Sequence, residues 1–91
     1  MPPTKDQVRS ETIRIISTFT TLSPAQVRAA FELKAPPMLI DDIGLAFLAE
    51  SLRGYVKQYK KDATVGASEM RKSGLTVADA VTLIQQKVGA Q

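Results

Sequence analysis

Apolar side chains recur at intervals of three and four residues in several stretches of the chain, with polar residues between them. This spacing is typical of helices that bury one face, whereas a half-buried strand would alternate apolar and polar positions. The first stretch predicts a helix over residues 5–20, and Thr4 with Gln7 has the spacing of a capping box. The apolar residues of this stretch are Val8, Ile15, Ile16 and Phe19.

A second helix is predicted to begin after Ser23. Ser23 is a suitable cap, Pro24 suits the first helical position, and Gln26 has the spacing needed to bond back to the cap. The residues expected to face inward are Val27, Ala30 and Phe31.

A long loop that contains Pro36 and Pro37 precedes the central helix. Each proline lacks a backbone donor and favours an extended conformation in the residue before it, so the segment is not expected to be helical. The central helix then begins at Asp42, which we expect to be its cap. Its apolar stripe consists of Leu48, Leu52, Tyr55, Val56 and Tyr59.

The last helix is predicted to open at Thr76, with Asp79 in its first turn, where a carboxylate favours the positive end of the helix dipole. Its buried face consists of Val77, Ala80, Val81, Ile84 and Val88. The connection before it, residues 60–74, is expected to contain a short helical turn that holds Val65 and Met70.

The predicted fold is therefore all-α: a small four-helix bundle over residues 1–91, forming one domain, with a long proline-containing loop before the central helix. Helices this short are stabilised mainly by the packing of their apolar faces. We expect a common core that includes Leu48, Leu52, Val56, Val81 and Ile84.

The amino-acid composition excludes several kinds of catalytic site and metal-binding site. The 91 residues include no cysteine and no histidine, which removes disulfides, thiolate metal sites, and the commonest general base and metal ligand. Asp41 and Asp42 are neighbours in sequence and are expected to point in different directions, so we do not expect an enzyme. No apolar run approaches the roughly 20 residues that a membrane span needs, and we expect a cytoplasmic protein.

Two segments resemble the acyl carrier protein family. They are "IDDIG", residues 40–44, and "LTVADAVTLIQQKV", residues 75–88. In that family a segment such as Val-Asp-Asp-Leu-Gly leads into Asp-Ser-Leu, and the last helix often begins Thr-Val-x-x-Ala. The resemblance spans residues 36–88 and implies an acyl-carrier-like bundle. It also implies a serine, at the start of the central helix, that carries a 4′-phosphopantetheine arm.

The chain departs from the family at that serine. With "IDDIG" aligned on the family motif, Ala46 replaces the usual aspartate and Phe47 replaces the serine, so the hydroxyl needed for attachment is missing. On this alignment the chain is a non-catalytic binding or interaction module without a cofactor. Phe47 is expected in the first helical turn, folded inward with Ile43 to cover the loop over residues 33–39; the alternative is an exposed anchor for a partner.

A second alignment restores the carrier chemistry. "ESL", residues 50–52, has the acidic-Ser-Leu form of the modification motif and places Ser51 at the attachment point. This alignment loses the match of Asp42 and Gly44. On it, the protein is a true acyl or peptidyl carrier that holds a thioester-linked group on a phosphopantetheine arm.

Basic residues give independent information about partners. Arg53, Lys57, Lys60 and Lys61 fall at helical spacing and are expected on one side of the central helix. Carriers are typically acidic and bind basic patches, which this side would repel. We therefore expect a protein partner with an acidic or apolar surface. Nucleic-acid binding ranks lower, because the net charge is only +3 and acidic residues are dispersed among the basic ones.

Overall fold

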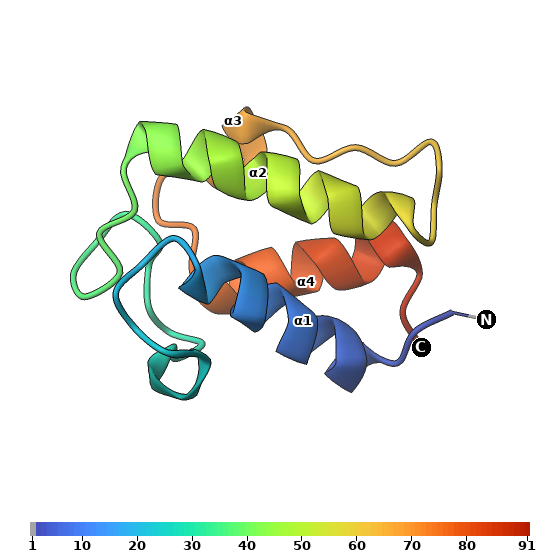
Figure 1. Cartoon of the computed structure of the whole chain (residues 1–91), viewed down its shortest axis with the longest axis horizontal. Helices are drawn as coiled ribbons and strands as arrows, with labels where there is room; N and C mark the ends of the chain where they lie inside the picture. Colours follow the sequence, from blue (N-terminus) through green and yellow to red (C-terminus); the bar gives the residue numbers. More distant parts are fainter. Residues whose placement is uncertain (1) are drawn as a thin grey trace.

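The computed structural model describes residues 2–91, and this part of the chain is all-α, as predicted (Figure 1). Its elements in order are α1 (Lys5–Ser17), the 3₁₀ turn η1 (Pro24–Gln26), α2 (Asp42–Lys57), α3 (Ala67–Met70) and α4 (Val77–Val88). None of the helices in the described residues combines the length and apolar character that a membrane-spanning segment requires.

Helix α1 begins as predicted and ends early. Thr4 and Gln7 form the reciprocal capping box, but the helix stops at Ser17 instead of continuing to Thr20. The Ser17 hydroxyl donates to the carbonyl of Arg14 at 2.7 Å, and the Thr18 hydroxyl donates to that of Ile15 at 2.7 Å. These side-chain bonds compete with further helical turns for the last carbonyl groups.

The prediction of a helix after Ser23 is wrong, because only its first turn forms, as the 3₁₀ turn η1. Gln26 bonds back to the Ser23 N–H at 2.9 Å as expected, but Val27 is already extended, with φ −78° and ψ 119°. Val27 is buried, whereas Ala30 is exposed. The following segment pairs instead with the start of α4, because the Val77 N–H donates to the Phe31 carbonyl at 2.8 Å.

Helix α2 is capped by Asp41, so the prediction of Asp42 as the cap is wrong by one residue. The Asp41 carboxylate accepts a hydrogen bond from the Gly44 N–H at 2.7 Å. At the other end the helix stops at Lys57, and Tyr59, Lys60 and Lys61 lie beyond it.

The predictions for the C-terminal third are confirmed. Thr76 and Asp79 cap α4 reciprocally, each through a bond of 3.1 Å between a side chain and a backbone N–H. Gly89 ends the helix in the left-handed conformation at φ +68°, which glycine adopts without steric cost. The short helix α3 follows Val65 and ends in Met70, and both side chains are buried.

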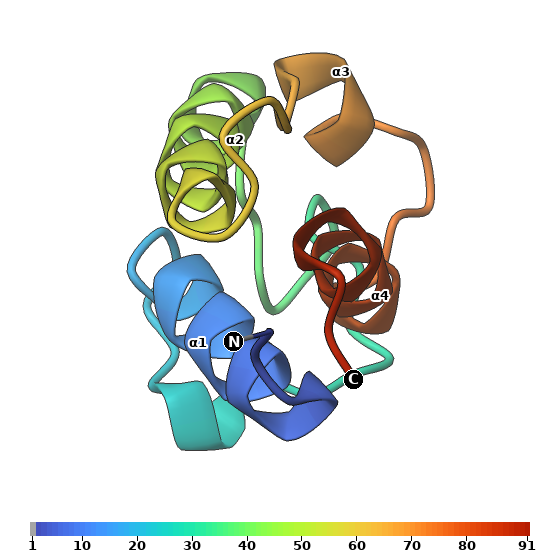
Figure 2. The same ribbon diagram turned by 90° about the vertical axis from the view of Figure 1, so that its right-hand side faces the viewer.

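Helices α1, α2 and α4 surround a common core, and α3 packs beside α2 (Figure 2). The five residues predicted to form the core, Leu48, Leu52, Val56, Val81 and Ile84, are all buried. The long loop adds Leu33, Met38 and Ile40 to the same cluster, which the sequence analysis did not predict. The termini meet where the Lys5 N–H donates to the Gln91 carbonyl at 3.1 Å.

A polar anchor joins α3 to α4. The Glu69 carboxylate accepts from the Gly66 N–H at 2.9 Å and pairs with Lys87 at 3.2 Å, while the Lys87 ammonium donates to the Thr64 carbonyl at 2.7 Å. The hydrogen bond from Gly66 lowers the pKa of Glu69 below its ordinary value of 4.5, and Lys87 lowers it further. The ionised carboxylate is therefore more favourable in the folded chain than in the unfolded chain.

The lowered pKa of Glu69 gives a pH prediction. Its contribution to stability is fully present above pH 4.5 and is lost as the pH falls through the lower folded value. Glu69→Gln should cost roughly 1 kcal/mol or less at pH 7, because the pair is partly exposed. The difference from the parent should vanish in more acidic buffer, as measured by urea unfolding from pH 7 to pH 3. Glu32→Gln, which removes an exposed carboxylate outside this anchor, is the control; an equal effect there would contradict the assignment.

Candidate docking surface on helix α2

Three large apolar side chains are exposed in the first turns of α2 and just before it. Leu39, Ile43 and Phe47 are spaced four residues apart, and their exposed fractions are 65%, 68% and 61%. Residues four apart lie one above the other on a helix, so Ile43 and Phe47 share the outer face of α2. We call these three residues the apolar ridge. Phe47 was predicted as a candidate partner-binding residue, whereas Leu39 was not, because its left-handed backbone outside the helix leaves no sequence signal.

The backbone before α2 turns one apolar residue outward and the next inward. Leu39 has φ +51°, a left-handed conformation that costs a non-glycine residue roughly 1–2 kcal/mol. The following Ile40 is buried, and its N–H donates to the Leu33 carbonyl at 2.9 Å. Gly44 then fits closely against this turn, since an added Cβ would lie 3.0 Å from Ile40 Cγ2. The burial of Ile40 and the close packing of Gly44 thus determine that Leu39 and Ile43 face outward.

Two expectations for Phe47 are wrong. The helix begins at Asp42, which places Phe47 in the second turn instead of the first. Its side chain is also exposed instead of folded inward. The physical reason is the period of α2, whose inner face carries Leu45, Leu48 and Leu52 and turns Phe47 to the opposite side.

In the resemblance to acyl carriers, the acidic pair corresponds to Asp41 and Asp42 at the start of α2, and the serine corresponds to Phe47 in the second turn. Asp41 is the cap and Asp42 is the first helical residue. Ser51 lies much farther along the helix and is exposed, and its neighbour Leu52 is buried. A carrier arm on Ser51 would therefore leave from the middle of α2.

A hollow of about 470 Å³ lies between α1 and the C-terminal half of α2, and none of the ridge residues lines it. Ser51 and Gly54 line it on the α2 side, and Arg14 and Thr18 line it on the α1 side. A Cβ added to Gly54 would meet nothing within 4 Å. The packing within one chain therefore does not require glycine at this position, although glycine costs a helix interior roughly 0.8–1 kcal/mol relative to alanine.

The basic residues do not form one helical face as predicted. Only Arg53 and Lys57 belong to α2, because the helix ends before Lys60 and Lys61. Arg53 pairs with Glu50 at 3.1 Å, whereas Lys57 is exposed near the C-terminal end of the helix. Basic charge is thus concentrated at one end of α2 and just beyond it.

Acidic charge is concentrated at the opposite end of α2. Asp41 and Asp42 are exposed there, and Asp42 pairs with Lys34 at 3.6 Å. Exposed pairs of this kind contribute little to stability. Arg71 connects the chain after α3 to this end by donating to the Asp42 carbonyl, at 2.7 Å from Nη2. Helix α2 therefore presents carboxylates at its start and ammonium groups at its end.

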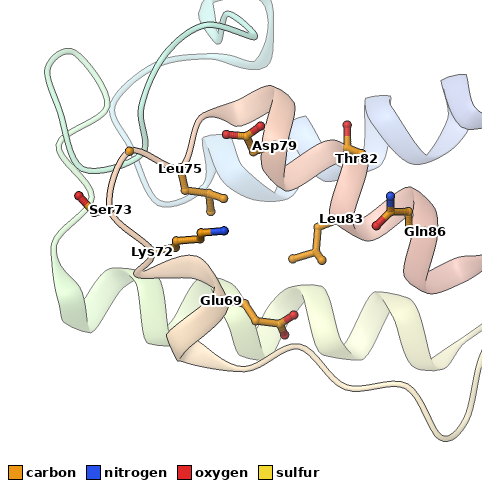
Figure 3. A pocket seen from close by; sticks show the side chains of 9 residues that line it. Glu69, Lys72, Ser73, Leu75, Asp79, Thr82, Leu83 and Gln86 are labelled. Carbon is orange, nitrogen blue, oxygen red and sulfur yellow. The ribbon is translucent and has the colours of Figure 1, made fainter.

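A second hollow, of about 430 Å³, lies between α4 and the connection from α3 (Figure 3). Lys72 and Leu83 point toward each other across it. Its two carboxylates already hold helix ends, since Glu69 accepts from Gly66 and Asp79 accepts from Thr76 at 3.1 Å. They are structural groups in this arrangement.

The tyrosine pair lies at the edge of the core. Tyr55 and Tyr59 contact edge to face, with ring centroids 5.5 Å apart, and Tyr59 is the more exposed. Burial, assisted by Tyr59, raises the pKa of Tyr55 to about 12. The Tyr55 hydroxyl is therefore protonated at neutral pH and is unsuited to act as a base.

Within residues 2–91, no group of three or more carboxylates is arranged to hold a metal ion. Comparisons with protein families, with curated proteins and with solved structures found no match to this chain.

A matched pair of substitutions on α2 tests the burial pattern. Leu52→Ala should lower the free energy of unfolding by roughly 2–5 kcal/mol, because Leu52 is fully buried. Phe47→Ala should change it by less than about 1 kcal/mol, because surface substitutions usually have small effects. Chemical denaturation measures both. A loss for Phe47→Ala as large as that for Leu52→Ala would show that the ridge supports the core.

Proposed function

We propose that this protein is a non-catalytic protein-interaction module with an acyl-carrier-like helical arrangement, and that it docks a protein partner on the outer face of α2. The observation that carries the proposal is the apolar ridge. Leu39, Ile43 and Phe47 are large, apolar and exposed, whereas Ile40 and Leu48 beside them in the sequence are buried in the core. Clustered apolar surface of this kind marks interaction sites, and aromatic residues contribute disproportionately to binding.

The order of elements supports the acyl-carrier-like part of the proposal. A first helix is followed by a long loop, a central helix, a short helix and a last helix opened by Thr76 and Val77. Asp41 and Asp42 lie at the start of the central helix, as the family's acidic pair would, and Phe47, which has no hydroxyl, stands at the position of the family's serine. The partner would offer an apolar contact to Phe47 and carboxylates to the basic end of α2.

Site-specific photocrosslinking tests this docking surface. p-Benzoylphenylalanine in place of Phe47 should give a discrete crosslinked product in cells, identified by mass spectrometry. The matched control is the same substitution at Thr82, an exposed position on α4. Product from position 82 alone, or from neither position, would contradict docking at the ridge.

A second candidate function rests on the exposed hydroxyl of Ser51 in the hollow beside α1. The exposure is compatible with a phosphopantetheine arm that holds an acyl or peptidyl group as a thioester. Co-expression with a broad-specificity phosphopantetheinyl transferase and measurement of the intact mass tests this function. If the protein is an interaction module, its intact mass should be that of the unmodified chain. A mass gain of one phosphopantetheine that is lost in Ser51→Ala would establish the carrier function instead.

A further inference from the structure

Leu39 combines a strained backbone with an exposed apolar side chain. Its φ of +51° lies in the left-handed region, which glycine and asparagine adopt more readily than leucine, because a leucine Cβ crowds the following carbonyl there. Its side chain is 65% exposed, so the core does not require leucine at this position. Residues held in such a conformation are concentrated at functional sites.

The fold requires the backbone turn at Leu39 but not its side chain. The Leu39 N–H donates to the Ala35 carbonyl at 3.0 Å, and the next N–H, that of Ile40, donates to the Leu33 carbonyl at 2.9 Å. The turn thereby places Ile40 in the core. Glycine would make the same turn without the steric cost. The folded chain by itself therefore gives no reason for leucine at position 39.

A hollow of about 330 Å³ lies beside Leu39, between the segment after α1 and the proline-containing loop. Its lining residues are all uncharged: Thr18, Phe19, Thr20, Thr21, Pro37, Met38 and Leu39. Two of the hydroxyls already donate to backbone carbonyls, that of Thr18 to Ile15 at 2.7 Å and that of Thr20 to Met38 at 3.1 Å. A charged group entering the hollow would lose hydration without gaining an ionic partner from this lining. The lining therefore favours an uncharged apolar group.

We propose that Leu39 is a binding residue of the docking surface, and that a protein partner inserts an uncharged apolar side chain into the hollow between Leu39, Phe19 and Pro37. This inference rests on the proposed function and extends its docking surface from α2 onto the two loops. The strain at Leu39 and the uncharged lining of the hollow carry it, and neither depends on the exposure of Ile43 and Phe47.

Substitutions at position 39 separate the backbone from the side chain. Leu39→Gly removes both the side chain and the strain, whereas Leu39→Ala removes the side chain and keeps the strain. The urea midpoint of Leu39→Gly should exceed that of Leu39→Ala and that of the parent. At a position with negative φ glycine would be the less stable of the two, because it loses more conformational entropy on folding. A midpoint of Leu39→Gly at or below that of the parent or of Leu39→Ala would overturn the proposal.

Photocrosslinking in cells tests the binding role of Leu39. The probe is p-benzoylphenylalanine at position 47, combined in turn with Leu39→Ala, Leu39→Gly and Leu39→Met. The first two variants should lower the yield of crosslinked product about fivefold or more, and Leu39→Met, which keeps a large apolar side chain, should retain the yield. Because Leu39→Gly is expected to be more stable than the parent, unfolding would not explain its loss of product. An unchanged yield in both Leu39→Ala and Leu39→Gly would overturn the role of Leu39.

A second probe position tests the hollow itself. Thr21 is exposed and lines the hollow, so p-benzoylphenylalanine in its place should crosslink to the same protein as the probe at position 47. The matched control is the same substitution at Thr82 on α4, which is exposed and lies outside this hollow. Mass spectrometry identifies each product.

The outcomes distinguish this inference from the proposed function. Product from position 47 that the Leu39 variants do not change, with none from position 21, would overturn the inference and leave docking through Phe47 intact. Product from position 21 alone, lost in Leu39→Ala, would support the hollow and contradict docking through Phe47. The same protein crosslinked from both positions, and lost in Leu39→Gly, would support both. Product from neither position would overturn both.

Discussion

The burial of the inner face of α2 against α1 and α4 is the interaction on which the rest of this structure depends. Leu45, Leu48, Leu52 and Val56 lie on that face and are fully buried. An isolated helix of 16 residues is marginal in water, so this packing supplies most of its stability. Once the inner face is fixed, the period of the helix determines which residues must face outward.

The apolar ridge is a consequence of that constraint combined with the loop. Leu33, Met38 and Ile40 are buried in the core on the side of the loop, and the period of α2 turns Ile43 and Phe47 outward. The left-handed backbone at Leu39 then adds a third apolar side chain to the surface. These exposed apolar side chains are the physical basis for proposing a docking function.

Polar groups near the ridge hold the start of α2 in place, and the exposed ion pairs among them contribute little to the free energy of unfolding. The Asp41 cap and the Arg71 bond to the Asp42 carbonyl fix the start of α2, so the ridge sits on a defined helix end. The exposed charges of Asp42 and Lys57 lie at opposite ends of α2 and contribute little to the stability of the chain. The same separation argues against a continuous basic track for phosphates, since Lys60 and Lys61 lie beyond the helix.

The all-α class, the caps at Thr4 and Thr76, and the core residues of α2 and α4 could be predicted from local patterns in the chain. These features follow from spacing and from local hydrogen bonds between residues a few positions apart. The conformation of the segment after Ser23 and the outward turn at Leu39 depend on tertiary contacts. Backbone N–H groups of α4 bond to the carbonyls of Ala29 and Phe31, and Ile40 bonds to Leu33, whose own N–H bonds to the Leu75 carbonyl. Contacts between residues far apart in the chain decide both, and periodicity carries no information about such contacts.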